Sequence, residues 1–545
     1  MKKYKIIVMA IGVMLLWSCY HEPKQQDLGI KHVVVIGFDG LSPDGIKKAN
    51  TPVFDSIIQN GSYTFHQRAV LPSSSSSNWA SMIMGADTEQ HGITSNAWEK
   101  DNFTLPAITE SEDFIFPTIF HLIDKQLPKA EIGAIYDWGG FGRLFEKSAV
   151  DYDVDASSED ETVTLASNYI EAKKPTFTFI HFDHIDHAGH EYGYGTEKYY
   201  KSVEKADKLL YKILQSVKNA GMAVNTLVII SADHGGIGKG HGGETLNEME
   251  IPFIIYGKSV KKGYEIKLPI YQYDNAATVA FALNLKMPYA WIGKPAKMAF
   301  EGYNITDDYP IKEMLEEPQF SPSYTSNKKP GGLFNEKTFL SFSNINDSTS
   351  IHYTLDGSMP SINSQKYSDN VLLTNNTVVK AAIFHKGKIA STVAESFYRI
   401  KPADYQPPVA YELFYLPKIT SVINTKGKTP NAIGTCFEIT SDEILQEIKE
   451  NTLVNFKTKI NIEQEDEYSF FLRSDDGSRL FLNRELIVDN DGEHGVLEKK
   501  GSKKLEPGVY DLEVTWFNAG GSGWLDVYYK SNSIPKQIIP TTSFR

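Results

Sequence analysis

Six aspartate and histidine residues follow hydrophobic runs at three places in the first half of this sequence. They are Asp39, Asp186, His190, Asp233, His234 and His241. An apolar run that ends in an acid is the usual way in which an α/β sheet presents ligands at the carboxyl ends of its strands. Three carboxylates and three imidazoles can hold two divalent metal ions, and the imidazoles favour zinc-like ions over magnesium. Two neighbouring ions suit displacement at phosphorus, because one can hold the nucleophile and the other the leaving oxygen.

A candidate nucleophile lies in the segment LPSSSSSNWASMIMGADTEQHGITSN. Its five serines, Ser73 to Ser77, are bounded by Pro72 and by an apolar stretch that looks helical. Composition alone favours a flexible, serine-rich loop. A position at the start of a helix instead favours an anion, because free backbone N–H groups and the helix dipole stabilise negative charge there. We therefore expect a serine alkoxide beside the metals.

Residues 28–312 alternate strand-like and helix-like segments, and these must position the site. Several short runs are rich in β-branched residues and lack polar alternation, which is typical of strands buried on both faces of a mostly parallel sheet. These runs are KHVVVIGFD, EIGAIYD, TFTFIHFD, TLVIISADH and IPFIIYG. Between them, the segment from Thr196 has apolar residues at helical spacing and stops at Gly221. The pattern predicts a doubly wound α/β domain.

The pattern of residues changes after residue 312. Two proline-rich linkers, SPSYTSNKKPGG and KPADYQPP, separate regions of short alternating segments with Asp-Gly turns. We predict β-sandwich domains over residues 328–400 and 409–545. The predicted fold class is thus an α/β doubly wound sheet followed by two all-β sandwiches.

The bulk properties limit the classes of partner. The chain has 545 residues, a net charge of −13 and a hydrophobic content of 41%. It has no basic stripe, which argues against nucleic-acid binding through phosphates. An acidic enzyme can still act on phosphate esters if metals neutralise the substrate locally.

The first 19 residues look like a targeting segment. Three lysines precede the apolar stretch Ile6–Trp17, which is too short to span a bilayer, and LWSC follows with Cys19 at its end. This resembles a bacterial lipobox, in which the cysteine is lipidated; a plain signal peptide is the alternative. We expect a periplasmic or surface-exposed lipoprotein of a Gram-negative cell envelope, attached to the membrane by lipid alone. The other cysteine, Cys436, has no partner for a disulfide.

On these motifs the first domain resembles the alkaline phosphatase superfamily, and within it the type I phosphodiesterase/nucleotide pyrophosphatase branch. The family's D-x-x-G-H stands at Asp186–His190 and its D-H-G at Asp233–Gly235. Its nucleophile lies ten residues before a glycine, with His-Gly six residues and Asn eleven residues beyond that glycine. Gly85, His91 and Asn96 fit this frame together, which places the nucleophile at Ser75.

The resemblance also implies ligand sets and a mechanism. One metal would be held by Asp39, Asp233, His234 and the Ser75 oxygen, and the other by Asp186, His190 and His241. Ser75 would attack phosphorus to give a phosphoserine that water hydrolyses. Asn96 and backbone N–H groups near Ser76 would stabilise the phosphoryl oxygens.

Other nearby side chains have simpler interpretations. We expect His181, His184 and His187 to pack near the site or to support its ligands, and His91 to be structural. Asp137, Trp138 and Trp98 are candidates for the wall of the substrate pocket or for ordinary packing.

The two β regions resemble known modules. IHYTLDGSMPS and TVVKAAIFH are similar to the sandwich at the C-terminus of chitobiases and hexosaminidases, and FFLRSDDGSRLFLN with GVYDLEVTWF is similar to the anthrax protective-antigen-type module. Some members of the second group bind sugars through calcium, so Asp475 and Asp476 are candidate calcium ligands; a plain turn is the alternative. The modules would target a glycan or cell surface.

The predicted function is an exported phosphodiesterase or nucleotide pyrophosphatase with two divalent metals. Three alternatives stay open: a phosphomonoesterase, a phosphotransferase, and a chiefly glycan-binding surface protein. A sulfatase is disfavoured, because Ser75 is not followed by the proline and arginine that its modified nucleophile requires. The choice between mono- and diester depends on residues 97–175, which carry no motif.

Overall fold

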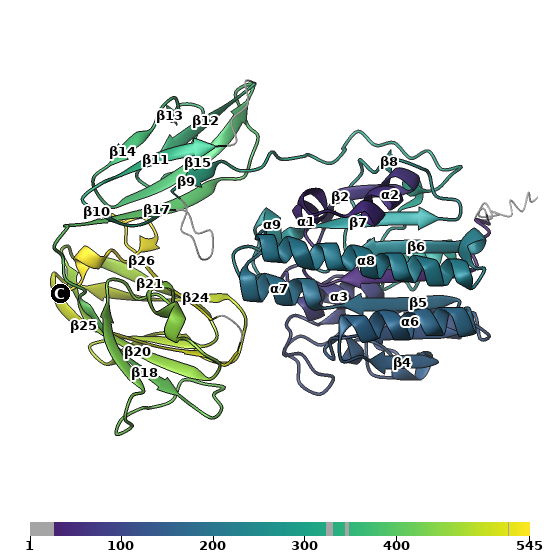
Figure 1. Ribbon diagram of the computed structural model, residues 1–545, viewed down its shortest axis with the longest axis horizontal. Helices are drawn as coiled ribbons and strands as arrows, with labels where there is room; N and C mark the ends of the chain where they lie inside the picture. The colour runs from purple at the N-terminus through teal and green to yellow at the C-terminus, as the bar shows by residue number, and fades with distance from the viewer. Residues whose placement is uncertain (1–26, 323–330, 344–347, 521–522) are drawn as a thin grey trace, which may run out of the picture.

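The structure is a computed structural model that describes residues 27–322, 331–343, 348–520 and 523–545 (Figure 1). The predicted targeting segment, including Cys19, lies outside the described residues. Within the described part of the chain, no helix is both long and apolar enough to cross a membrane.

The first domain is built on one eight-stranded sheet in the order β4-β3-β5-β1-β6-β7-β2-β8. Its strands are β1 (His32–Phe38), β2 (Ser62–Arg68), β3 (Ile132–Tyr136), β4 (Tyr152–Asp155), β5 (Phe177–Phe182), β6 (Thr226–Ser231), β7 (Glu250–Gly257) and β8 (Tyr264–Glu265). Only β7 runs against its neighbours, so the strands that carry the predicted acids are parallel. β5 and β6 are buried along their whole length, as the absence of polar alternation predicts.

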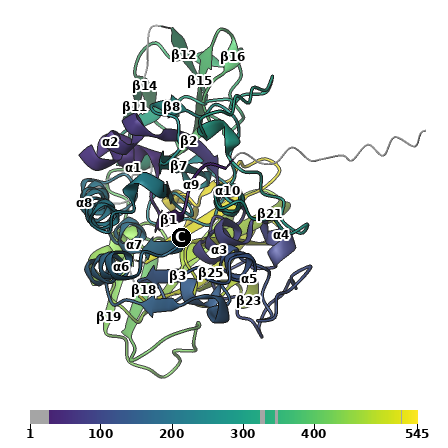
Figure 2. The same cartoon turned by 90° about the vertical axis from the view of Figure 1, so that its right-hand side faces the viewer.

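Helices cover both faces of this sheet (Figure 2). One face is covered by α1 (Pro43–Lys48), α2 (Pro52–Asn60), α6 (Glu159–Lys173), α7 (His184–Tyr192) and α8 (Glu197–Asn219), and the other by α3 (Ser75–Met84), α5 (Ile119–Gln126) and α10 (Asp274–Ala282). Successive residues of β1 serve the two cores in turn: Val33 and Val35 face α3, whereas Val34 and Ile36 face α8. The predicted doubly wound α/β domain is confirmed.

Two all-β regions follow, also as predicted. The middle module (residues 328–400) has sheets of order β10-β17-β15-β12-β13 and β14-β11-β9. Its strands are β9 (Gln319–Ser321), β10 (Gly331–Asn335), β11 (Thr338–Ser343), β12 (Thr349–Thr354), β13 (Gln365–Lys366), β14 (Val371–Leu373), β15 (Thr377–His385), β16 (Lys388–Ile389) and β17 (Ala394–Lys401). The predicted linker is wrong at both ends. Its first residue, Ser321, belongs to β9, which pairs with β11, and its last two, Gly331 and Gly332, begin β10.

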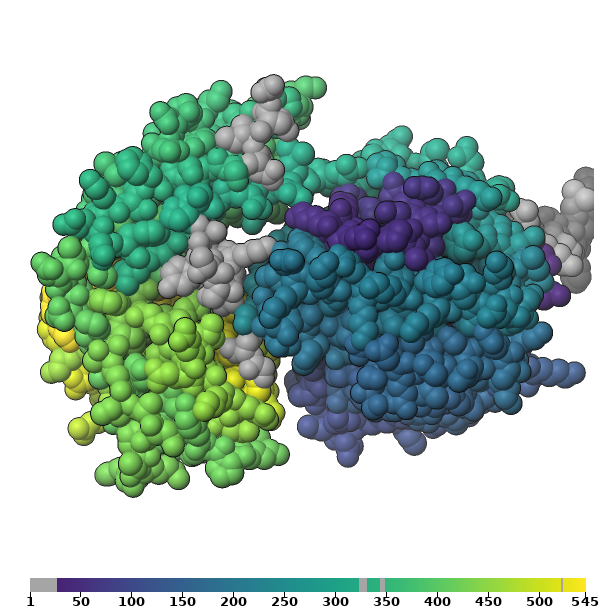
Figure 3. Space-filling model, viewed as in Figure 1, coloured from purple at the N-terminus to yellow at the C-terminus, as the bar shows by residue number. Residues whose placement is uncertain are grey.

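The C-terminal module (residues 409–545) packs a six-stranded sheet, β19-β18-β20-β25-β22-β23, on a four-stranded sheet, β24-β21-β26-β27. Its strands are β18 (Val409–Tyr415), β19 (Ala432–Cys436), β20 (Thr452–Ile462), β21 (Asp466–Asp475), β22 (Ser478–Leu482), β23 (Glu485–Asn490), β24 (Leu497–Leu505), β25 (Gly508–Asn518), β26 (Trp524–Lys530) and β27 (Gln537–Ile538). A buried two-pronged ion pair joins the two modules, because Arg399 donates through Nε and Nη2 to Glu438, at 2.8 Å each. Figure 3 shows both modules to one side of the first domain.

Candidate active site

The carboxyl ends of β5, β1 and β6 place the predicted acids together. The strands are adjacent and in register, with Phe38 beside Phe182 and Gly37 beside Ser231. Residues that directly follow parallel strands emerge at the same edge of the sheet, which is why positions far apart in the sequence meet here. The structure brings all six predicted metal ligands to this edge, in two groups.

The buried ligand group consists of Asp39, Asp233 and His234, whose side chains are at most 1% exposed. His234 Nε2 lies 3.4 Å from Asp39 Oδ1 and 3.1 Å from Asp233 Oδ2. Ser75 Oγ lies 3.3 Å from the same nitrogen. The four side chains that the family resemblance assigns to one metal are therefore neighbours.

The loop ligand group consists of Asp186, His190 and His241. Asp186 and His190 lie one turn apart on α7, whereas His241 comes from the loop after β6. His190 Nε2 is 3.2 Å from Asp186 Oδ2, and His241 Nε2 is 3.7 Å from Asp186 Oδ1. The side chain of His190 is 29% exposed, so this group opens toward solvent more than the buried group does.

All three imidazoles are oriented in the same way. His234 Nδ1 lies 2.8 Å from the carbonyl oxygen of Gly235, His190 Nδ1 2.9 Å from that of Lys239, and His241 Nδ1 2.8 Å from that of Ser73. A carbonyl can only accept, so each Nδ1 carries a proton, and each Nε2 faces carboxylate oxygens. Imidazole Nε2 atoms and carboxylate oxygens that converge form a donor set for divalent metals, and an Nδ1–H donated to a carbonyl is the usual support of a histidine metal ligand.

The carboxylates fit cations for a second reason. Asp39 Oδ1 and Asp233 Oδ2 are buried and accept no hydrogen bond. Burial, reinforced by the neighbouring Asp39 and Asp186, raises the pKa of Asp233 well above its usual range. Uncompensated buried carboxylates are costly, and divalent ions would remove that cost, so the residues present fit two metals.

The serines form a fixed turn rather than a flexible loop. Ser74 precedes the helix and Ser75 is the first residue of α3. Asn78 fastens the turn, because its Nδ2 donates to the carbonyl oxygens of Val70, Pro72 and Ser74. The predicted placement of Ser75 at a helix N-terminus therefore agrees with the structure, and its Oγ faces the buried ligand group.

Trp79, on the same helix, donates a hydrogen bond to the buried ligand group. Its indole Nε1 donates to Asp39 Oδ2 at 3.1 Å. The ring fits only because position 37 of β1 is glycine: a Cβ there would lie 2.5 Å from the indole. A glycine inside a strand is thus explained by the close approach of a side chain that holds a ligand.

Asn96 lies beside Ser75, but it already has one partner. Its Oδ1 accepts from the Ser76 backbone N–H at 2.8 Å, which leaves the Asn96 amide nitrogen as the donor to a substrate. Backbone N–H groups near Ser76 were also predicted to bind phosphoryl oxygens. In the structure, the Ser76 N–H instead donates to Asn96 Oδ1.

The sequence analysis missed Arg143. This residue ends the short 3₁₀ turn Phe141–Arg143, and its Nη2 donates to Ser76 Oγ at 3.1 Å and to the Asn96 carbonyl oxygen. Its Nη1 pairs with Glu99 at 2.7 Å, and its Nε is buried without a partner. A guanidinium beside the candidate nucleophile suits phosphoryl oxygens. No motif marks it, because it lies in the uninformative region between residues 97 and 175.

Asp183 was also missed. It directly follows β5 and forms a third group of possible metal ligands with Asp39 and Asp186 among the described residues. Burial, together with Asp39 and Asp186, raises the pKa of Asp183 to about 8. The rule that an acid ends an apolar strand, which pointed to Asp186, applies more directly to Asp183.

The three other histidines near the second motif, His181, His184 and His187, have different surroundings. His181 is buried, with Nε2 3.4 Å from Asp39 Oδ2 and Nδ1 3.6 Å from Asp137 Oδ1, so it supports a ligand. His184 packs against Phe38 and Phe182. The expectation for His187 is wrong: its side chain is 74% exposed and faces Glu191, because it lies on the outer side of α7.

The other polar and aromatic candidates have structural roles. His91 is buried and bonded through Nε2 to Ser81 Oγ at 2.9 Å, as expected of a structural residue. Trp98 belongs to the core of the first domain. Asp137 accepts from the Asp183 backbone N–H at 2.8 Å, and Trp138 stacks on His181. These contacts favour packing and support over a pocket wall.

The predicted calcium ligands differ from the metal groups of the first domain. Asp476 accepts from the His494 N–H at 3.0 Å and from the Ala519 N–H at 2.7 Å, one bond for each carboxylate oxygen. Neither Asp475 nor Asp476 belongs to the groups of possible metal ligands found among the described residues. Calcium binding there stays a prediction.

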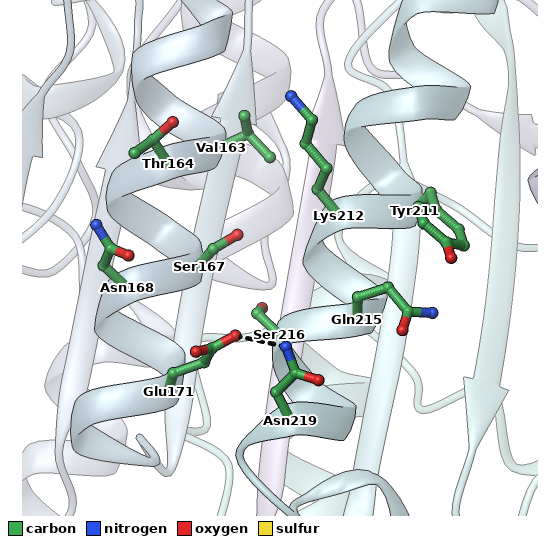
Figure 4. A pocket seen from close by; sticks show the side chains of 10 residues that line it. All are labelled: Val163, Thr164, Ser167, Asn168, Glu171, Tyr211, Lys212, Gln215, Ser216 and Asn219. Atoms are coloured by element: carbon green, nitrogen blue, oxygen red, sulfur yellow. Dashed lines mark hydrogen bonds between the residues drawn. The ribbon is translucent and has the colours of Figure 1, made fainter.

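A polar pocket elsewhere on the first domain is separate from this site. It lies between α6 and α8 and has a volume of about 410 Å³. At one end, Asn219 donates to Glu171 at 2.9 Å (Figure 4). None of the predicted site residues lines it.

Three regions of the chain match known protein families. Residues 33–238 match the model of the type I phosphodiesterase / nucleotide pyrophosphatase family, residues 329–395 that of the chitobiase/beta-hexosaminidase C-terminal domain, and residues 413–543 that of the PA14 domain. Human bis(5'-adenosyl)-triphosphatase ENPP4 is 25% identical over 213 residues, which are 37% of this chain and 47% of that protein. Venom phosphodiesterase CdcPDE of Crotalus durissus collilineatus is 26% identical over 217 residues, 36% of this chain and 26% of that one.

The chain spans about half the length, or less, of the curated relatives it matches. Among solved structures, murine ectonucleotide pyrophosphatase / phosphodiesterase 5 aligns with a TM-score of 0.41 and 17% identity, over 47% of this chain and 96% of that one. Three successive parts of the chain thus match the type I phosphodiesterase / nucleotide pyrophosphatase family, the chitobiase/beta-hexosaminidase C-terminal domain and the PA14 domain.

Proposed function

We propose that this protein is a metal-dependent hydrolase of phosphoric diesters and phosphoanhydrides in which Ser75 is the nucleophile. The observation that carries the proposal is the common orientation of the three imidazoles, each held through Nδ1 by a backbone carbonyl with Nε2 toward carboxylates. The name of ENPP4, a bis(5'-adenosyl)-triphosphatase, favours the same class of bond.

The residues of the chain divide the work as follows. Asp39, Asp233 and His234 would hold one ion, and Asp186, His190 and His241 the other; the three imidazoles favour zinc. When bound, such ions supply positive charge that lowers the pKa of a neighbouring hydroxyl and neutralises phosphoryl oxygens.

Ser75 Oγ would form the bond to phosphorus while the ester or anhydride oxygen leaves on the opposite side. From a diester or an anhydride, this step leaves a phosphodiester of Ser75 that keeps the other substituent of the phosphorus. Water then attacks this phosphorus, the bond to Ser75 Oγ breaks, and Ser75 regains its proton as the product with the remaining substituent is released. The Asn96 amide nitrogen is placed to donate to a phosphoryl oxygen, because its own oxygen is fixed on the Ser76 N–H.

The test is turnover of bis-p-nitrophenyl phosphate against p-nitrophenyl phosphate by the zinc-loaded protein. We expect a preference for the diester and a loss on the order of 10⁶-fold in Ser75→Ala, as for the covalent serine nucleophile of a protease. Ser77→Ala is the matched control, since Ser77 Oγ bonds only to Ser74 Oγ at 3.1 Å. Undiminished turnover in Ser75→Ala would refute the assignment.

Arg143 favours a second candidate, a phosphomonoesterase. A monoester carries three unsubstituted oxygens and a double negative charge, and a guanidinium beside Ser76 could bind the oxygen that an ester group replaces in a diester. A strong preference for p-nitrophenyl phosphate in the same assay would select this candidate.

We further propose that the protein is an exported lipoprotein of the bacterial cell envelope, lipidated on Cys19, with C-terminal modules that recognise glycans. The lipobox-like LWSC and the two module families support this. Labelling of the wild type, but not of Cys19→Ser, by a palmitate analogue tests the anchor. Binding of the full-length protein to a glycan array tests the modules.

A further inference from the structure

The C-terminal module touches the loop that completes the metal site. Gly240 is buried, and a Cβ at that position would lie 2.5 Å from Cγ2 and 2.8 Å from Cβ of Val496, directly before β24. In Figure 1, β24 lies on the side of the C-terminal module that faces α7. The loop before His241 is thus packed against a domain that begins more than 160 residues later in the sequence.

This loop holds each member of the loop ligand group. It is closed by a pair of hydrogen bonds between Ile237 and Gly240, at 2.9 and 3.2 Å. The Lys239 carbonyl oxygen fixes His190 Nδ1 at 2.9 Å, and His241 follows Gly240 in the chain.

Asp186 is connected to the same loop through Tyr194. The backbone N–H of Tyr194 donates to the Gly238 carbonyl oxygen at 2.7 Å, and the Tyr194 hydroxyl donates to Asp186 Oδ1. A shift of the loop would therefore move or release all three ligands at once.

Charges also face one another across this contact. Asp442 of the C-terminal module and Glu191 of α7 lie within electrostatic reach of the Lys239 ammonium. Asp475, at the end of β21, lies within the same reach of the His190 side chain. The module therefore meets the loop through polar as well as apolar groups.

The carboxylates of the buried ligand group are held by the first domain alone, although the His234 ring stacks on His241 with ring centroids 3.6 Å apart. Asp39 is held by Trp79, and Asp233 accepts from the backbone N–H groups of Gly40 and His234 at 3.1 and 2.9 Å. All of these partners belong to the first domain, so the two groups differ in what supports them.

We infer that the C-terminal module is a structural part of the metal site formed by Asp186, His190 and His241, with Val496 as a positioning residue that braces Gly240. The inference rests on the proposed function, because it presumes that these three residues hold an ion. It assigns the module a task at the catalytic centre besides any binding of glycans.

The experiment measures zinc binding by the full-length protein in competition with a chromophoric chelator. We expect two tight ions in the wild type. In Val496→Ala one ion should bind about 10-fold more weakly, which is the lower end of the effect of losing a partner that orients a ligand. The other ion, at the buried ligand group, should keep its affinity and show that the first domain is still folded.

Two further variants sharpen the test. Gly240→Ala should weaken the same ion by steric overlap with Val496, and Gly240→Ala/Val496→Ala should recover part of the affinity, because the added methyl fills space that the valine vacates. Val509→Ala, a half-exposed valine of β25, is the matched control and should bind both ions as the wild type does.

The outcomes separate the brace from the proposed function. If the wild type binds two ions tightly and both Val496→Ala and Gly240→Ala bind them equally well, the positioning role of Val496 is refuted while the proposed function stands. If the wild type bound no zinc and showed no Ser75-dependent turnover, the proposed function would fall and the inference with it. Equal weakening of both ions in Val496→Ala would also overturn the inference, since it requires an effect on one site.

Discussion

Two regions of this molecule carry aspartates at the ends of β-strands, and they use them in opposite ways. In the first domain, Asp39 and Asp233 each have one oxygen that accepts hydrogen bonds and one, Asp39 Oδ1 or Asp233 Oδ2, that is buried without a hydrogen-bond partner beside His234 Nε2. In the C-terminal module, both oxygens of Asp476 accept from backbone N–H groups. A carboxylate with both oxygens bonded to the backbone can hold two loops together, whereas a buried carboxylate oxygen without a donor is suited to a cation.

The comparison is tested most strongly at Asp233, whose Oδ2 has no hydrogen-bond partner. We expect Asp233→Asn to lower turnover of the preferred ester by more than about 100-fold, the upper range for partners that merely orient a ligand, and to remove one of two bound zinc ions. The metal-free variant should unfold at no lower temperature than the metal-free wild type, because burial and neighbouring acids already raise the pKa of Asp233. A variant with two tight ions and full activity would break the comparison.

An unpartnered donor, Nε of Arg143, lies beside the candidate nucleophile. We expect Arg143→Ala to reduce kcat/KM for p-nitrophenyl phosphate by about 100-fold, the effect of removing one preorganised donor, and to reduce the diester rate less. Lys147→Ala is a suitable control, since Lys147 lies nearby but pairs with Asp153 at 2.6 Å. Equal losses for both substrates would show that Arg143 does not discriminate between them.

Zinc should stabilise the metal-free protein because it compensates the clustered carboxylates. At a free zinc concentration of 100 times Kd, mass action gives about 2.7 kcal/mol, which calorimetry would detect as a rise in the Tm of the first domain. Magnesium should raise it less, since three of the six ligands are imidazoles. Asp233→Asn should lose most of the zinc effect, and an unchanged Tm in the wild type would contradict the metal assignment.

Mutation of Asp476, whose two carboxylate oxygens both accept hydrogen bonds, should have the smallest effect. We expect Asp476→Asn to cost about 1–2 kcal/mol of stability, because the asparagine keeps one acceptor but loses the charge that strengthens both bonds. Asp511→Asn, an exposed residue of β25, should leave the Tm within error. If calcium raised the Tm of the wild type but not of Asp476→Asn, the calcium-binding prediction would hold and the comparison would need revision.

Much of the first domain could be predicted from local patterns. Apolar runs without polar alternation predicted β1, β3, β5, β6 and β7, because a strand buried on both faces has no polar side to show. β2, β4 and β8 escaped notice: β2 and β4 alternate with polar residues, and β8 has only two residues. The choice of Ser75 among five serines depended on the family frame, and the helix start at that residue agrees with it.

Some features of the site could not be predicted, since they depend on contacts between distant segments. Arg143 reaches Ser76 and Asn96 from a 3₁₀ turn with no recognisable pattern. His187 shares its segment with His184 and His190, yet the rotation of α7 turns it outward. Only the helix geometry, fixed by packing, decides which histidines of such a segment face the site.

The sequence by itself determined the fold class, the order of the domains and the six candidate ligands, because periodicity and strand-end acids are local properties of a chain. The tertiary structure alone decided how those ligands are supported. It placed the Nδ1 atoms of three histidines on backbone carbonyls, and it brought Val496 of the C-terminal module against Gly240. Apart from the contact between His234 and Gly235, these contacts join segments that are distant in the sequence, and they arise only when parallel strand ends and separate domains are packed together.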